Sequence, residues 1–164
     1  ALSQDNTLFK NIATRQIAVL ASDGFDMDSF EKMNSALKEK NAFVKIIAPK
    51  GGKIKCSKGM EHKVDASIST TESVLFDAIF IPGGSESIKA LQNKIKFVKF
   101  INEAFKHCKA IAFQDEAIDL IKHTAVHDHL DDEAIHQDDA PDQFIESIAQ
   151  HRNWKRETKI NVAV

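Results

Sequence analysis

Several kinds of residue are scarce in this 164-residue sequence, and each scarcity excludes a class of function. There is no tyrosine, so no tyrosinate can serve the chain as a metal ligand. The longest apolar runs, at residues 17–21 and 78–82, are far shorter than the roughly 20 residues that a membrane helix needs. The formal net charge is -2, so no basic excess is present to bind a nucleic acid backbone. We therefore expect neither a membrane nor a nucleic acid as partner.

Cysteine is scarce as well, and the two that occur, Cys56 and Cys108, form no CxxC motif. No secretory signal precedes them, which indicates a reduced, cytoplasmic setting. The polar opening lacks an initiator methionine, so we interpret residues 1–14 as a linker tail of a longer protein. Residues 15–154 have the length and the hydrophobic content of one domain, and residues 155–164 are interpreted as a C-terminal tail.

Short apolar runs alternate with helical patterns along the predicted domain. The runs predict strands buried on both faces, as in a parallel sheet, at residues 16–21, 42–48, 77–81 and 110–113. Helical spacing predicts helices at residues 28–41, 87–92, 95–107, 116–122 and 142–152. A small hairpin is expected at residues 53–64 and a short strand at residues 134–135. This order predicts a flavodoxin-like, doubly wound α/β fold, with a mostly parallel sheet and helices on both faces.

Three segments follow strands at the carboxyl edge of such a sheet, where ligands bind. They are residues 22–28, 82–87 and 113–116. In the first, Asp28 followed by Glu31 has the spacing of a capping box, so we expect Asp28 to cap a helix. In the second, Gly83 and Gly84 predict an unusual backbone turn.

These segments resemble the ThiJ/PfpI group of the class I glutamine amidotransferase-like superfamily. The resemblance lies in Asp23-Gly24-Phe25-Asp26, in residues 76–84 with their Pro-Gly-Gly ending, and in residues 109–112. It implies a cysteine nucleophile at the elbow between the last of these strands and its helix. We interpret this region as a degenerate elbow, because none of its side chains is a nucleophile: Phe113, Gln114, Asp115 and Glu116. Asp28, Gly83 and Gly84 would form the matching degenerate pocket.

One branch of this superfamily is more similar than the rest, namely the C-terminal domain of large-subunit haem catalases. The shared phrases lie at residues 18–26, 47–50, 73–78, 82–87, 98–109 and 148–154. The resemblance implies a parent enzyme that converts hydrogen peroxide to water and oxygen with haem bound by a tyrosinate, which this chain lacks. It implies that the fragment has no cofactor and contacts the catalase core and neighbouring subunits of a homotetramer. Its expected role is to stabilise the assembly or to limit access to the haem.

Two alternatives remain open from the sequence. One is a binding or chaperone-like module of the ThiJ/PfpI type. The other is a residual cysteine hydrolase, although we interpret Cys108 as a structural thiol at the opposite edge of the sheet. Four histidines lie in an acidic stretch but match no defined metal site, so no metal is predicted: His123, His127, His129 and His136. Trp154 is expected to pack on its own domain or on a neighbour.

Overall fold

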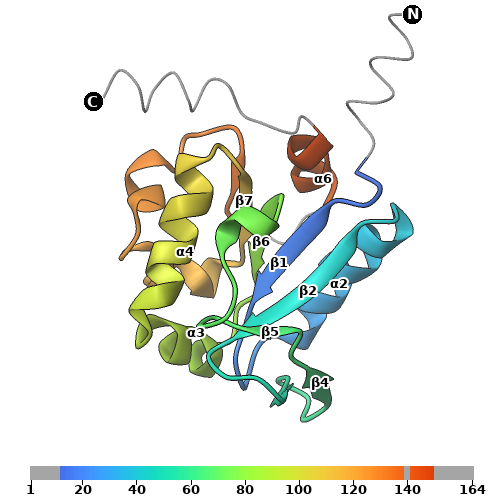
Figure 1. Ribbon diagram of the computed structural model, residues 1–164, viewed down its shortest axis with the longest axis vertical. Helices are drawn as coiled ribbons and strands as arrows, with labels where there is room; N and C mark the ends of the chain where they lie inside the picture. Colours follow the sequence, from blue (N-terminus) through green and yellow to red (C-terminus); the bar gives the residue numbers. More distant parts are fainter. Residues whose placement is uncertain (1–11, 139–140, 150–164) are drawn as a thin grey trace, which may run out of the picture.

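A six-stranded parallel sheet lies at the centre of the computed structural model, which describes residues 12–138 and 141–149 (Figure 1). The strands stand in the order β5-β2-β1-β6-β7-β8, and each neighbouring pair is parallel. Without the two-residue β5, this is the 2-1-3-4-5 order of flavodoxin-like folds, so the predicted fold class is confirmed. The strands are β1 (Gln16–Leu20), β2 (Phe43–Ala48), β5 (Ala66–Ser67), β6 (Ala78–Ile81), β7 (Ala110–Phe113) and β8 (Ile135–His136).

Helices cover both faces of the sheet. One face carries α2 (Met27–Glu39) and α6 (Pro141–Ala149); the other carries α3 (Ser85–Gln92), α4 (Ile95–Lys106) and α5 (Ile118–Ile121). Short 3-10 segments lie between these elements in the described residues: η1 (Ser73–Leu75), η2 (Asp115–Ala117) and η3 (Ala125–His129). No helix within the described residues is long and apolar enough to span a bilayer. The predicted end of the last helix at residue 152, and Trp154, lie outside the described residues.

The core consists of two layers because side chains alternate between the two faces of each strand. Ile17 and Val19 of β1 join the cluster beneath α2 and α6, whereas Ala18 and Leu20 join the cluster beneath α3, α4 and α5. All four side chains are at most 1% exposed. Burial on both faces explains why these runs read as continuously apolar in the sequence.

The predicted hairpin is present as β3 (Lys53–Lys55) paired antiparallel with β4 (Glu61–Lys63). Backbone hydrogen bonds fasten it to the loop after β1: Gly24 N–H donates to Lys55 C=O at 2.7 Å, and Ser57 N–H donates to Phe25 C=O at 2.8 Å. The hairpin therefore holds the β1–α2 loop in place beside the carboxyl edge of the sheet.

The amino edge of the sheet is also tied together. Asn41 follows α2 with a φ of 65°, the left-handed conformation that commonly ends a helix. Its carbonyl accepts a hydrogen bond from Thr14 N–H at 3.0 Å, and Ile12 is buried in the cluster beneath α2 and α6. The boundary between tail and domain at residues 14 and 15 stays a prediction.

Candidate functional site

Three loops meet where β1, β6 and β7 end. The connections from β1 and β6 leave the sheet on opposite faces, toward α2 and α3, so their carboxyl ends flank the topological switch point. Ligands of doubly wound sheets bind in the crevice at this point. In this chain the crevice is bridged by protein groups.

The side chain of Gln114 makes the central bridge. Its Oε1 accepts a hydrogen bond from the Gly83 backbone N–H at 2.6 Å, and its Nε2 donates to Asp26 Oδ2 at 2.9 Å. Asp26 N–H in turn donates to Gly83 C=O at 3.0 Å. Both ends of the carboxamide are thereby satisfied, and one side chain connects the ends of all three strands.

Asp26, and not Asp28, caps helix α2. The Asp26 backbone is extended, and its side chain accepts hydrogen bonds from the backbone N–H groups of Asp28 and Ser29. The expectation that Asp28 caps the helix is therefore wrong. It rested on Glu31 three residues further on, the acidic partner of a capping box, whereas Ser29 occupies that spacing from Asp26.

Asp28 itself lies outside the place where the loops after β1, β6 and β7 meet. Its side chain is 81% exposed, and Oδ1 accepts a hydrogen bond from Lys58 Nζ of the hairpin at 2.8 Å. This bond raises the pKa of Lys58 above its ordinary value. Because both groups are exposed to solvent, the pair contributes little to stability.

Gly83 and Gly84 allow the loops to approach one another. Gly84 has a φ of 102°, and a Cβ atom there would collide with the backbone carbonyl of Gly24. A Cβ atom at Gly83 would collide with the Gln114 carboxamide. The two glycines thus have structural reasons for their presence, namely a special turn and a close contact between loops.

The rest of the elbow has an ordinary backbone. Gln114 has φ -74° and ψ 154°, and Asp115 and Glu116 begin the 3-10 turn η2 with exposed side chains, while Phe113 is buried in the core. Within the described residues, the non-glycine positions with positive φ are Thr14, Asn41 and Cys108. The strained turn typical of nucleophile elbows is therefore not formed at Gln114.

Both cysteines lie away from this elbow. Cys108 immediately precedes the short link to β7, at the amino end of the strand whose carboxyl end leads to Gln114, and it is 0% exposed. Cys56 lies in the turn of the hairpin and is 4% exposed. Neither thiol is placed to act as the nucleophile of a ThiJ/PfpI-type site.

The histidines of the acidic stretch are dispersed. His129 stacks on Phe105 with ring centroids 5.1 Å apart, and a ring nitrogen of His136 is hydrogen-bonded to Ser147 Oγ at 2.8 Å. In the part of the chain that the structure describes, no three His, Cys, Asp or Glu side chains converge as metal ligands would.

A hollow of about 900 Å³ lies beside the place where the three loops meet. It is bounded by the hairpin, the β1–α2 loop and the start of α3. Its walls carry Lys53 and Lys55 together with Asp23 and Glu86, so the two charge signs are mixed. Neither Gly83 nor Gln114 lines it. The hollow is thus separate from the position at which a ThiJ/PfpI nucleophile would act.

The family model that matches the chain is the C-terminal domain found in long catalases, over residues 13–158. The chain belongs to this family. Catalase HPII of Mycobacterium avium is 34% identical over 96% of the chain and 25% of its own length. Catalase-B of Dictyostelium discoideum is 32% identical over 98% of the chain and 24% of its own length. The chain thus spans about a quarter of the length of these relatives.

Solved structures agree on the fold. Toxoplasma gondii DJ-1, oxidized, superimposes with a TM-score of 0.67 at 16% identity, covering 92% of this chain and 97% of that one. Drosophila melanogaster DJ-1beta gives a TM-score of 0.63 at 17% identity, covering 92% and 97%. The predicted ThiJ/PfpI-like fold and the predicted membership of the catalase branch are therefore confirmed.

Asp26 is the residue of this site that the sequence analysis missed as a functional contact. Three aspartates lie in residues 23–28 after β1, and the capping-box spacing to Glu31 favoured the third: Asp23, Asp26 and Asp28. The signal that could have found Asp26 is its place immediately before Met27, the first apolar residue of the helical pattern.

Proposed function

We propose that this chain is a non-catalytic C-terminal domain of a large catalase and that it stabilises the assembled enzyme. The observation that supports this most directly is the bonding of Gln114. Its carboxamide occupies the Gly83 N–H group that could otherwise stabilise an oxyanion, and a glutamine side chain is no nucleophile. The place where the three loops meet therefore offers no nucleophile for catalysis of the ThiJ/PfpI type.

The peroxide chemistry belongs to the rest of the longer protein in this proposal. Haem iron in catalases is bound by a tyrosinate, and this chain has no tyrosine. The residues present therefore do not fit a catalase haem site. The parent enzyme would convert hydrogen peroxide to water and oxygen in its larger, N-terminal part. The scarcity of cysteine and the lack of a CxxC motif favour the cytoplasm as its location.

A domain without chemistry can still contribute binding energy. Surface that it buries against the catalase core or a neighbouring subunit of a homotetramer favours the folded, assembled state by mass action. An interface of standard size covers about 800 Å² on each partner. The 8929 Å² of accessible surface on this chain leaves ample room for one.

Deletion of the domain from the full-length enzyme tests the proposal. The shortened enzyme should keep its turnover per haem at moderate temperature but lose activity faster on heating and dissociate at lower denaturant concentration. Unchanged heat resistance and unchanged assembly would refute the stabilising role. If deletion instead changes turnover at low peroxide concentration with stability intact, the domain limits access to the haem.

A further inference from the structure

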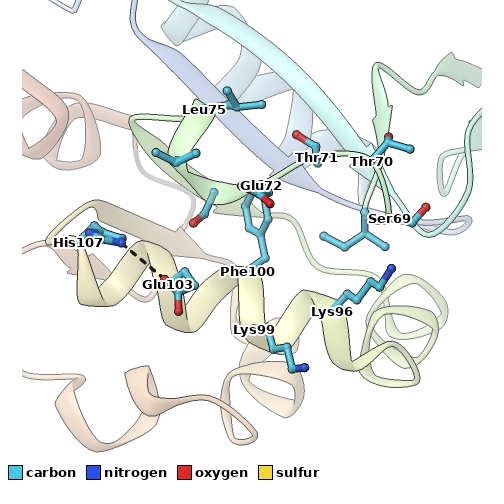
Figure 2. A pocket seen from close by; sticks show the side chains of 13 residues that line it. Ser69, Thr70, Thr71, Glu72, Leu75, Lys96, Lys99, Phe100, Glu103 and His107 are labelled. Carbon is cyan, nitrogen blue, oxygen red and sulfur yellow. Dashed lines mark ion pairs between the residues drawn. The ribbon is translucent and has the colours of Figure 1, made fainter.

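An exposed apolar pair lies on the 3-10 turn η1. Val74 is 69% exposed and Leu75 is 60% exposed, and together they are two of the five large hydrophobic side chains exposed in the described ranges. Both line a groove of about 710 Å³ between residues 68–75 and helix α4 (Figure 2). Adjacent exposed apolar side chains beside a groove are typical of an interaction surface.

The groove has an apolar floor. Ile68 and Phe100 are each 5% exposed and line its bottom, and Phe100 points from α4 toward the 68–75 segment in Figure 2. Phe76 packs against Phe100 with ring centroids 5.9 Å apart. An apolar side chain entering the groove would therefore meet hydrophobic contacts on both walls.

The segment that forms one wall is fixed in place. Lys109 Nζ donates a hydrogen bond to Ser73 C=O at 2.6 Å, and Phe76 N–H donates to the same carbonyl at 3.0 Å. A preformed wall can bind a partner without first being ordered, which lowers the entropic cost of the contact.

The rim of the groove has no dominant charge. Lys96 and Lys99 are offset by Glu72 and Glu103, and Glu103 Oε2 pairs with His107 Nε2 at 3.5 Å. A strongly charged peptide or a nucleic acid would find no complementary field there. Hydroxyl side chains of residues 69–71 also line the groove, so its chemistry fits a protein surface that is largely uncharged and carries some apolar side chains.

The groove lies close to the point where the chain enters the sheet. Gln16, the first residue of β1, donates its N–H to Asp77 Oδ2 at 2.8 Å and accepts the Asp77 N–H at 2.7 Å. Asp77 follows Leu75 by two residues, and Arg15 pairs with it at 3.8 Å. In long catalases this domain is C-terminal, so the rest of the chain is tethered to it through this entry point. A tethered body is present at high effective concentration.

We propose that the groove between residues 68–75 and α4 is the docking surface for the catalytic body of the same long catalase. The body would cover the exposed side chains of Val74 and Leu75 and place apolar side chains in the groove against Phe100. This inference rests on the proposed function and assigns the surface through which it acts.

The test uses the full-length enzyme with Val74→Glu and Leu75→Glu combined, because a buried carboxylate without a partner opposes docking. Hydrogen exchange in residues 68–75 should accelerate by about tenfold or more, and heat resistance should fall toward that of the domain-deleted enzyme. Met60→Glu is the matched control, since Met60 is 54% exposed but lies on the hairpin at the other edge of the sheet. Unchanged protection in β1 and β6 would show that the variant domain is folded.

Two results would overturn the inference. If deletion lowers heat resistance while the groove variant matches the wild type, the proposed function stands and the surface is wrong; if deletion has no effect, both fail. A photo-crosslinking amino acid at position 75 gives a second measurement that needs no disruptive change. Crosslinks to the catalytic body support the inference, and crosslinks to the same domain of another subunit contradict it.

Discussion

Gln114 and Asp26, 88 positions apart in the sequence, are joined by a 2.9 Å hydrogen bond from Nε2 to Oδ2. The opposite end of the same carboxamide accepts the Gly83 N–H. Within the elbow at which the ThiJ/PfpI resemblance implies a reactive thiol, the Gln114 side chain therefore holds three loops together.

Gln114→Ala should destabilise the domain by about 1–3 kcal/mol, because the Gly83 N–H and the Asp26 carboxylate lose a partner in a partly buried site. The free energy of unfolding is measured by urea denaturation. Gln137→Ala, on an exposed side chain, should stay within roughly 0.5 kcal/mol of the wild type. Equal stability of all three proteins would show that the hydrogen bonds of the Gln114 side chain contribute nothing to stability.

Asp26→Ala and Asp28→Ala distinguish the observed helix cap from the predicted one. Loss of the Asp26 cap should cost about 0.5–2 kcal/mol, with a further loss from its bond to Gln114. Asp28→Ala removes only an exposed ion pair and should cost less than about 1 kcal/mol. Thermal unfolding of both variants checks the order, and a larger effect at Asp28 would contradict the structure.

Gly84→Ala and Gly52→Ala separate backbone strain from a steric clash. Both glycines have positive φ, 102° and 98°, but a Cβ at Gly52 would meet nothing within 4 Å, whereas one at Gly84 would meet the Gly24 carbonyl. Gly52→Ala should therefore cost about 1–3 kcal/mol from strain alone. Gly84→Ala should cost clearly more, or prevent folding, as measured by the yield of folded protein and its urea midpoint. Similar values for both variants would refute the close contact.

Thiol labelling tests for a residual hydrolase. Cys56 and Cys108 are 4% and 0% exposed, so an alkylating reagent should label neither at an appreciable rate in the folded protein and both after denaturation. Mass spectrometry of the labelled protein identifies the site. Rapid, stoichiometric labelling of one cysteine under native conditions would revive the hydrolase alternative.

Lys109 should give the domain a pH dependence at alkaline pH. Burial lowers the pKa of Lys109 below 10.5, and the nearby Asp77 opposes this in part. Between the lowered pKa and 10.5 the unfolded chain binds more protons than the folded one, so this group makes stability rise with pH. Lys109→Met should abolish that rise in urea midpoints measured from about pH 8 to about pH 10.5. Lys99→Met, on an exposed side chain, serves as control and should retain it.

The sheet could be predicted from the sequence because its strands are buried on both faces. The runs that contain Val19, Phe80 and Ala112 have no polar interruption, and each became a central strand. The two-residue β5 was missed because a pair of residues has no periodicity. Its pairing with β2 depends on where the long connection after the hairpin returns to the sheet.

The residue types of the predicted elbow are read directly from the sequence, but their hydrogen bonds could not be predicted. The absence of a nucleophile follows from residue types alone. The partners of Gln114 lie 31 and 88 positions away, so no local spacing points to them. The exposure of Val74 and Leu75 could not be predicted either, because it depends on which elements, distant in the sequence, cover that part of the sheet.

The contact between Gly84 and the Gly24 carbonyl also bears on how such a domain could change over time. A cysteine introduced at position 114 would put a thiol beside Gly83 N–H, but the close approach of the Gly24 and Gly84 loops would hinder the entry of a substrate there. Catalysis at this position would require the loop after β1 to move as well, and with it the hairpin that is fastened to Gly24. A substitution at position 114 alone would therefore not create a working site, because the loop geometry would also have to change.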